Sequence, residues 1–333
     1  MKHLFARKPI SLMLQEMEGD NRLRRALGPV ALTSLGIGAI IGTGIFVLTG
    51  IAAHDKAGPA LMLSFVVSGL TCVFAALCYA EFASRVPVAG SAYTYAYATL
   101  GEFMAWIIGW DLVLEYAVTS ATVAHGWSHY FQNFIGIFGI ALPPALSRAP
   151  FDFDPATGSF LATGAIVDLP SIVITLVITA VLVKGIRESA GFNIAMVVIK
   201  LAAVLFVIAV GAFYIDPANW RPFAPYGYSG VSFFGHTVFG QAGPGGAPLG
   251  MLAGAAIIFF AYVGFDSVST HSEEARNPRR DVPIAIIVSL VICTVLYLAV
   301  SAVLTGMVRY DSLNIDAPVA DAFRQVGLTW AQV

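Results

Sequence analysis

Long apolar stretches constrain this chain of 333 residues more than any other feature, because they recur along most of its length. About 20 consecutive apolar residues form a helix that crosses the roughly 30 Å hydrocarbon core of a bilayer. Only 11% of the residues are charged, against about a quarter in a soluble domain. The sequence therefore predicts an all-α polytopic membrane protein. Seven membrane spans are predicted, at residues 29–51, 59–82, 103–123, 169–183, 191–214, 249–270 and 283–308.

The amino-terminal segment and the charge distribution narrow the class of protein. Residues 1–28 are charged and have neither the apolar core nor the cleavage pattern of a signal peptide, which predicts a cytoplasmic tail. Outside this tail the sequence has no basic tract, so we expect no nucleic-acid partner. The expected partner is the lipid bilayer. A small membrane protein could also bind, but no segment identifies it.

Residues that bind metals or catalyse reactions are not grouped in this sequence. The three cysteines, Cys72, Cys78 and Cys293, lie in apolar spans and lack metal-ligand spacing. The six histidines are scattered over loops and span ends, and we interpret them as ordinary polar residues without ligand spacing. A nucleotide-binding loop, a zincin motif and a nucleophile elbow are missing. We therefore expect no enzyme activity, no metal site and no cofactor.

Lysine and arginine are concentrated on one side of the predicted membrane topology. If the amino terminus lies inside, the tail and the loops at 83–102, 184–190 and 271–282 face the cytoplasm and carry most of the 18 Lys and Arg residues. Positive charge accumulates on cytoplasmic loops. The sequence thus predicts a multi-pass protein of the plasma (inner) membrane with a cytoplasmic amino terminus.

The first span contains GIGAIIGTGIF at residues 36–46, where glycines and a threonine replace the leucines of an ordinary membrane helix. Each glycine lowers helix stability by about 1 kcal/mol relative to alanine. Backbone groups freed in hydrocarbon must bind another partner or lie beside a water-filled cavity. We therefore predict that helical hydrogen bonding is lost at residues 42–44 and that a small polar ligand binds there. Close helix packing through the GxxxG pair Gly38 and Gly42 is the alternative.

A second irregular patch, FFAYVGFDS at residues 259–267, lies in the sixth span and contains Gly264 and the acidic Asp266. We predict that it loses regular helical bonding at residues 261–264. In transporters built from inverted repeats, two discontinuous helices meet at the substrate, with helix amino termini facing its carboxylate and unwound carbonyls facing cations. A zwitterion such as an amino acid fits that arrangement. The alternative is an aromatic helix end whose Asp reaches toward the interface.

Ionisable side chains within the predicted spans are the next signal, because a charge in the bilayer core is costly and so indicates function. Lys200 lies about 14 Å into the fifth span at 1.5 Å per residue, close to the midplane. Burial favours the neutral amine, so Lys200 could gain and lose a proton in each transport cycle. Glu115 lies similarly deep in the third span, with Asp111 one turn earlier on the same face. A structural pair between helices is the alternative for each.

Three segments resemble signatures of a known family: residues 36–46, ALCYAEFASRVPVAGSAYTYAYATLGEFMAWIIGWDLVLEY at 76–116, and FFAYVGFDSVSTHSEEARNPRRDVPIAI at 259–286. They are similar to amino acid permeases of the amino acid, polyamine and organocation (APC) superfamily, most of all to the bacterial cationic amino acid transporters. The resemblance implies the leucine-transporter-type fold, in which helices 1–5 and 6–10 are inverted repeats. It also implies alternating access to a central amino-acid site.

The resemblance further implies roles for individual residues. Backbone around Thr43 and Gly44 would bind the substrate carboxylate, and carbonyls before the first break and within the second would bind the amino group. Lys200 would occupy the position of sodium in sodium-coupled relatives, so Lys200, Glu115 and Thr43 are the expected proton-coupling residues. The expected substrate-binding residues are Ile40, Ile41, Gly42, Thr43, Gly44, Phe260, Ala261, Tyr262, Val263 and Asp266.

The number of predicted spans departs from the family pattern. Permeases of this family need at least ten helices, whereas this sequence ends where an eighth span would begin. We therefore expect residues 29–333 to form an incomplete transmembrane domain, with helices 1–5 as the first repeat and helices 6 and 7 as the start of the second. We also expect that the chain alone does not catalyse uptake.

Proton-coupled symport of an amino acid is the function that these features favour. A protonated Lys200 would repel a sodium ion, which argues against sodium coupling. A sodium-coupled or exchange mode on the same fold stays open as an alternative, as does a non-transporting amino-acid sensor that only binds the ligand. The sequence does not indicate whether the substrate is cationic or neutral.

Overall fold

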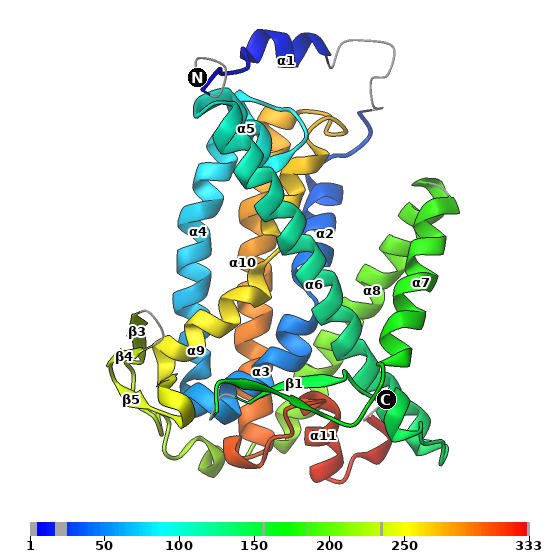
Figure 1. The fold of residues 1–333 in the computed structure, drawn as a ribbon, viewed down its shortest axis with the longest axis vertical. Coiled ribbons are helices and arrows are strands. Elements are labelled where there is room, and N and C mark those ends of the chain that lie inside the picture. The colour runs from blue at the N-terminus through cyan, green and yellow to red at the C-terminus, as the bar shows by residue number, and fades with distance from the viewer. Residues whose placement is uncertain (1–4, 17–24, 155–156, 185, 234–235, 332–333) are drawn as a thin grey trace. The chain divides into compact units, whose positions relative to one another are not determined.

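The computed structural model describes residues 5–16, 25–154, 157–184, 186–233 and 236–331 (Figure 1). Helices dominate this part of the chain, as expected for a polytopic membrane protein, whereas part of the predicted tail at 1–28 lies outside the described residues. The α-helices are α1 Ile10–Glu16, α2 Pro29–Ile40, α3 Thr49–Ala52, α4 Leu61–Arg85, α5 Ser91–Thr99, α6 Glu102–Ile137, α7 Leu169–Lys184, α8 Ile186–Gly211, α9 Met251–Ile258, α10 Pro278–Met307 and α11 Pro318–Gln325.

Fewer helices than predicted are long enough to cross a membrane. Two of the seven predicted spans correspond to short apolar helices, Pro29–Ile40 and Leu169–Val183. The first is short because the helix is interrupted after Ile40, and the chain beyond the interruption runs on with α4 as one helical segment. Within the described residues, the five segments with sufficient length and apolar character are Gly44–Arg85, Glu102–Ile137, Ile194–Tyr214, Met251–His271 and Pro278–Met307.

The third predicted span, 103–123, is too short. Helix α6 continues for more than a dozen residues past Val123 because no proline interrupts the polar sequence that follows. It ends in a Schellman motif, in which the amide of Gly139 bonds to the carbonyl of Gly136 and that of Ile140 to the carbonyl of Ile135. Gly139 adopts a φ of +73°, which glycine tolerates without strain. Hydropathy indicates which residues of a helix lie in the hydrocarbon core, but it does not indicate where the helix ends.

The last predicted span, 283–308, begins too late. Helix α10 starts at Pro278, so Pro283 lies inside it rather than at its first position. Proline has a suitable φ for the first helical position and loses no hydrogen bond there. The carboxylate of Asp281 accepts a hydrogen bond from the amide of Asn277 at 3.2 Å, which satisfies a donor just before the helix. Asp281 therefore helps to cap the helix, which starts more than one turn earlier than the sequence suggests.

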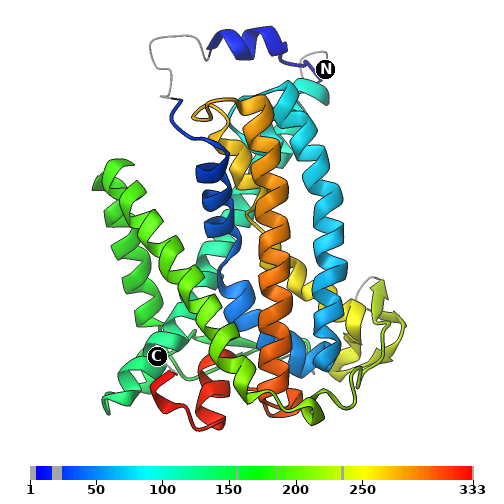
Figure 2. The ribbon, with the colours of Figure 1, turned by 180° about the vertical axis from the view of Figure 1, so that it is seen from behind.

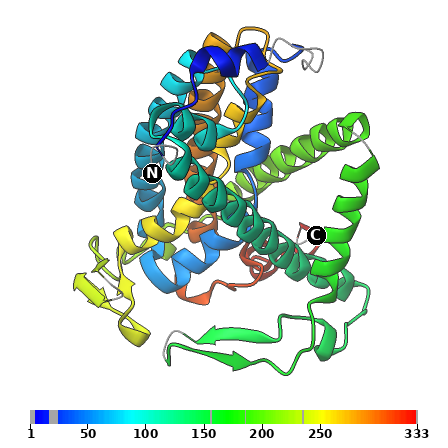
Figure 3. The same cartoon turned by 45° about the horizontal axis from the view of Figure 1, so that its top comes forward.

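The loops of the described chain contain small two-stranded sheets beside the mostly helical membrane segments. Strand β1 (Phe151–Asp154) pairs with β2 (Ser159–Ala162) in an antiparallel hairpin that is clearest in Figure 3. Phe153 and Phe160 face each other in this register, with ring centroids 5.4 Å apart, so an aromatic cross-strand pair stabilises the hairpin. The other pairs are β3 (Val231–Phe233) with β4 (His236–Phe239), and β5 (Gln241–Ala242) with β6 (Pro248–Leu249).

The chain divides into two compact units. The first comprises Met1–Ile41, Gly69–Ser120 and Tyr262–Thr294. In it, the segment before α2 is joined to the one before α10, because the amide of Arg276 bonds to the carbonyl of Leu27 at 2.8 Å. Helix α2 packs closely at Gly36, where an added Cβ would lie 2.7 Å from Oγ of Ser289 and 2.8 Å from a methyl of Val268. Small residues therefore set the packing of α2.

The second unit comprises Gly42–Ser68, Ala121–Ala261 and Val295–Val333. Its helix α9 is bound to the start of α4 by two serines one turn apart. Oγ of Ser64 donates to the carbonyl of Met251 at 2.6 Å, and Oγ of Ser68 to that of Ala255 at 2.7 Å. Helices α7 and α8 also lie side by side in this unit (Figure 2). Hydroxyl-to-carbonyl bonds between helices stabilise membrane bundles at close packing distance.

Candidate functional site

The first predicted interruption is present in the structure. Helix α2 ends at Ile40, Ile41 has an extended conformation with φ −71° and ψ 110°, and Gly42 forms a bend. A π-helical turn, Gly44–Leu48, then begins a new helix. The amide groups in the first turn of any helix have no partner within that helix. The chain thus presents a helix amino terminus inside an apolar segment, where the partial positive charge favours an anionic group.

The second predicted interruption is also present. Helix α9 ends at Ile258 and continues as a 3-10 turn, Phe259–Tyr262. Gly264 then adopts a φ of +105°, and a second 3-10 segment, Phe265–His271, follows. A side chain at 264 would be strained by this φ and would lie 2.9 Å from the carbonyl oxygen of Ala39. Glycine is therefore needed both for the turn and for the close approach of α2 in the first unit.

The two interrupted helices touch in the second unit. A Cβ added at Gly44 would overlap with the Cα and Cβ of Ala261, so the two backbones are in direct contact. The carbonyl of Ala261 accepts a hydrogen bond from Oη of Tyr297 at 3.0 Å, and Tyr297 is fully buried. Tyr297, which the sequence analysis does not single out, holds one of the carbonyls expected to bind a substrate amino group. A carbonyl oxygen has a second lone pair and can accept another donor.

Thr43 packs against a glycine of α6. Thr43 is 9% exposed, and a Cβ added at Gly126 would lie 2.7 Å from its Cγ2 atom and 3.3 Å from a methyl of Val47. One turn further along α6, Oη of Tyr130 donates to the carbonyl of Phe46 at 2.6 Å. Helix α6 thus fixes the first turn after the interruption from one side. Gly126 lies just beyond the third predicted span, 103–123, so the sequence prediction missed this contact.

An acidic cluster lies in the first unit. The carboxylate of Asp266 is 5% exposed and accepts hydrogen bonds from Oγ of Ser91 at 3.0 Å and from Oη of Tyr116 at 3.3 Å. Ser91 has a φ of +49°, a left-handed conformation that costs about 1 kcal/mol for a residue with a Cβ. Glu115 is half-buried and close enough for its charge to repel that of Asp266. The hydrogen bond to a buried carboxylate therefore offsets the strain at Ser91.

Lys200 lies midway along α8 in the second unit and is half-buried. Asp111, on α6 in the first unit, is exposed. The expected substrate-binding residues are mostly buried, with Gly42, Phe260 and Val263 half-buried. The structure thus brings Gly44 to Ala261 and Glu115 to Asp266, each pair within one unit. The coupling roles of Lys200, Glu115 and Thr43 and the contacts of the binding residues with substrate stay predictions.

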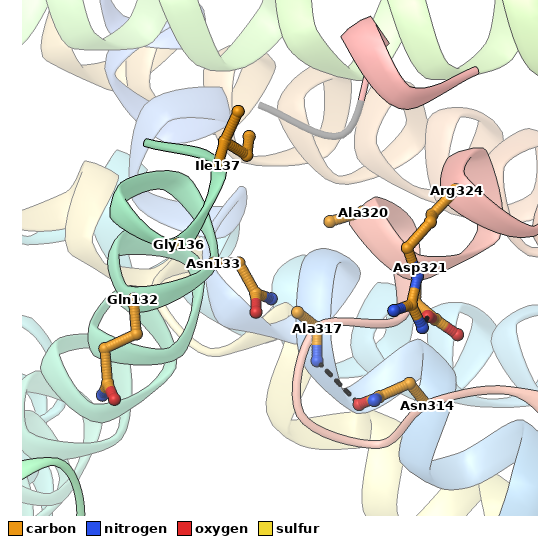
Figure 4. Close-up of a pocket in the computed structure, with 9 residues that line it drawn as sticks. All are labelled: Gln132, Asn133, Gly136, Ile137, Asn314, Ala317, Ala320, Asp321 and Arg324. Carbon is orange, nitrogen blue, oxygen red and sulfur yellow. Dashed lines mark hydrogen bonds and ion pairs between the residues drawn. The ribbon is translucent and has the colours of Figure 1, made fainter. Parts of the chain in front are cut away.

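A cavity of about 350 Å³ lies away from these interruptions, between the end of α6 and α11 (Figure 4). Asp321 forms an ion pair with Arg324 at its edge, and the amide of Ala317 bonds to Oδ1 of Asn314 at 3.3 Å. These side chains satisfy one another, so we assign the cavity no function. The residues that line it are Gln132, Asn133, Gly136, Ile137, Asn314, Ala317, Ala320, Asp321 and Arg324.

The chain is similar to several known membrane transporters. The chain is 47% identical over 328 residues to the branched-chain amino acid permease BcaP of Bacillus subtilis, covering 98% of this chain and 64% of that protein. It is 46% identical over 327 residues to the methylthioribose transporter of the same organism, again covering 98% and 64%. Cationic amino acid transporter 4 of Homo sapiens is 40% identical over 331 residues, 96% of this chain and 46% of that protein.

The chain thus spans between 46% and 64% of the length of these relatives. All three are named as permeases or transporters and none as an enzyme, in line with the missing catalytic motifs. Residues 27–333 match the family model described as amino acid permease, which confirms the resemblance drawn from the three sequence segments. The chain therefore belongs to the amino acid permease family.

Proposed function

We propose that this protein is a secondary active amino acid transporter that works by alternating access. The observation that carries the proposal is the direct contact of two interrupted helices at Gly44 and Ala261. Discontinuous helices that meet within the membrane bind small substrates through their unwound backbone in many transporters. The names of the branched-chain permease and of the cationic amino acid transporter support an amino acid as the substrate class. We place the protein in the plasma membrane with its amino terminus in the cytoplasm.

The substrate would bind along the unwound backbone on both sides of this contact. Its carboxylate would accept hydrogen bonds from the amides of Thr43 and Gly44, at the positive end of the new helix. Its amino group would donate to the carbonyls of Phe260 and Ala261, at the negative end of the 3-10 turn. Ile40, Ile41, Gly42, Tyr262, Val263 and Asp266 complete the proposed binding residues.

Proton coupling would depend on Lys200, assisted by Glu115 and Thr43. An ammonium in the membrane core is costly, so an amine there exchanges its proton when its surroundings change during transport. A protonated amine at a cation site also repels sodium. We therefore expect uptake that is driven by a proton gradient and is independent of sodium.

The test is uptake by the full-length gene product reconstituted in vesicles. Radiolabelled leucine and arginine are supplied with an imposed pH gradient, with and without sodium, and every other amino acid is tested as a competitor. Saturable accumulation that needs the pH gradient and no sodium supports the proposal. Uptake that needs sodium or an internal amino acid would replace proton symport by sodium coupling or exchange, and binding without uptake would indicate a sensor.

Methylthioribose is the second substrate to test, because the methylthioribose transporter is as similar to this chain as the branched-chain permease is. A sugar derivative has neither the carboxylate nor the amino group that the helix ends would bind. If methylthioribose is accumulated and no amino acid competes with it, the proposed contacts at Thr43, Gly44 and Phe260 are wrong.

A further inference from the structure

Two histidines of α6 face each other in the second unit. His125 and His129 are one helical turn apart, and their Nε2 atoms lie 3.1 Å from each other. Their ring planes are nearly perpendicular, at 84°, with centroids 4.5 Å apart. Residues at i and i+4 share one face of a helix, so this pair departs from the expectation of scattered histidines without ligand spacing.

Asp168, which directly precedes α7, fixes the orientation of His125. Its Oδ2 atom lies 2.9 Å from Nδ1 of His125, while Oδ1 accepts a hydrogen bond from Oγ of Ser128 at 2.6 Å. Asp168 is 9% exposed, and the amide of Ser171 also donates to it at 3.3 Å. A carboxylate beside Nδ1 holds a proton there and leaves the lone pair on Nε2. Metal-binding histidines in proteins are oriented in this way by a carboxylate.

We propose that His125 and His129 together bind one divalent transition-metal ion through their Nε2 atoms. Zinc-to-nitrogen bonds of about 2.05 Å place two ligand atoms about 2.9 Å apart at a right angle and about 3.35 Å apart in a tetrahedron. The observed 3.1 Å lies between these limits. Without a metal, the same separation is that of a hydrogen bond between the two Nε2 atoms. To bind the ion, His129 gives up this bond, carries its proton on Nδ1 and presents the Nε2 lone pair. The proposal concerns metal binding alone and does not rest on the transport function.

The surroundings of the pair allow a metal ion to enter. The side chain of His125 is 48% exposed, so water can reach the ion and fill the remaining coordination positions. Three charged side chains affect His129: the carboxylates of Asp168 and Asp316 and the guanidinium of Arg148. The two carboxylates outnumber the one cation, which favours a positive ion near the site. No group of three or more His, Cys, Asp or Glu side chains in the described residues could hold a metal ion. Two protein ligands make the site exchangeable, and imidazole nitrogens favour copper, nickel and zinc.

Isothermal titration of the full-length gene product with NiCl₂ or ZnCl₂ tests this site. The protein is purified without a polyhistidine tag and stripped with a chelator. We expect one ion per chain, binding weakened at least tenfold by His125→Gln or His129→Gln, and a 10–100-fold loss for Asp168→Asn, which removes only the carboxylate that orients His125. His236→Gln, which replaces an exposed histidine in β4, is the matched control and should leave binding unchanged.

Thermal unfolding without metal shows whether each variant is folded. Bound metal should raise the unfolding temperature of the wild type and not that of folded His129→Gln, because a ligand that binds only the native state stabilises it. Equal affinity of the wild type and the folded histidine variants would overturn the proposal. If the histidine variants do not fold, the electron paramagnetic resonance spectrum of Cu²⁺ added to the wild type decides: coupling to two imidazole nitrogens supports the site, and its absence overturns it.

Discussion

At the scale of single residues, the position of Thr43 depends on the absence of a side chain at Gly126. We expect Gly126→Ala to displace Thr43, because the new methyl would lie 2.7 Å from Cγ2, and so to raise the KM for uptake several-fold or more. Gly136→Ala is the control, since it lies on the same helix with no atom within 4 Å of the added Cβ. Equal kinetics of the two variants would show that Thr43 has no part in transport.

Lys200 is the residue on which proton coupling is proposed to depend. Lys200→Met removes the titrating amine and keeps a long apolar side chain, so we expect substrate binding to persist while the pH dependence of uptake disappears. Uptake is measured in vesicles between pH 5.5 and 8, and binding by the change in unfolding temperature on adding substrate. A Lys200→Met variant that still concentrates substrate in response to a pH gradient would contradict the assignment.

Asp168 is expected to make stability depend on pH. Burial raises the pKa of its carboxyl. Hydrogen bonds from Ser128, Ser171 and His125 lower the pKa by more than burial raises it, so the pKa lies below its usual value. A carboxylate with a lowered pKa stabilises the fold at neutral pH, and this stabilisation is lost as the pH falls through the folded pKa. At pH 7, the free energy of unfolding of Asp168→Asn should be about 1–3 kcal/mol lower than that of the wild type.

This difference between Asp168→Asn and the wild type should shrink as the pH falls below about 4, the pKa of an unfolded aspartate, and should disappear below the lowered pKa of the folded carboxyl. Thermal unfolding in the presence of a chelator measures it without any contribution from bound metal. Asp152→Asn, at an exposed position of β1, is the control and should differ little from the wild type at each pH. A constant difference across the pH range would show that the charge of Asp168 is unimportant.

At the scale of secondary-structure elements, the contact of the two interrupted helices should be sensitive to volume. Gly44→Ala places a methyl against the backbone of Ala261, and overpacking of this kind costs about 1–3 kcal/mol. Gly136→Ala should instead be neutral or stabilise α6 by up to about 1 kcal/mol, because it replaces an exposed helical glycine. The unfolding temperatures of the two variants in detergent test this, and similar values would mean that the contact is loose.

Glycine content predicts both helix interruptions, because glycine weakens a helix and allows the backbone conformations that unwinding requires. The last residue of α6 and the first residue of α10 are not predictable from hydropathy, because hydropathy measures apolar character and not helix capping. Contacts such as Ser91 with Asp266 and Tyr297 with Ala261 join residues distant in sequence, and a single sequence does not reveal which pairs meet. The spacing of His125 and His129 is visible in the sequence, but only the carboxylate of Asp168 distinguishes this pair from two surface histidines.

At the scale of the whole molecule, the distribution of positive charge predicts which loops face the cytoplasm. We expect a cysteine at exposed Ser159, in the β2 hairpin, to react with a membrane-impermeant maleimide in intact cells. A cysteine at exposed Arg279 should react only after the cells are permeabilised. Both are introduced after replacing Cys78, the exposed native cysteine. The reverse labelling pattern would invert the proposed topology.

Gly44 lies close to Ala261, and Gly126 lies close to Thr43. These two contacts restrict differently which substitutions relatives can carry. The obstacle to a side chain at 44 includes the Cα of Ala261, which every amino acid possesses, so no change at 261 compensates and position 44 should remain glycine. The obstacle at 126 is the methyl of Thr43, which serine lacks. Relatives with alanine at 126 should therefore carry serine at 43, a paired substitution that preserves the hydroxyl and leaves a trace in any alignment of the family.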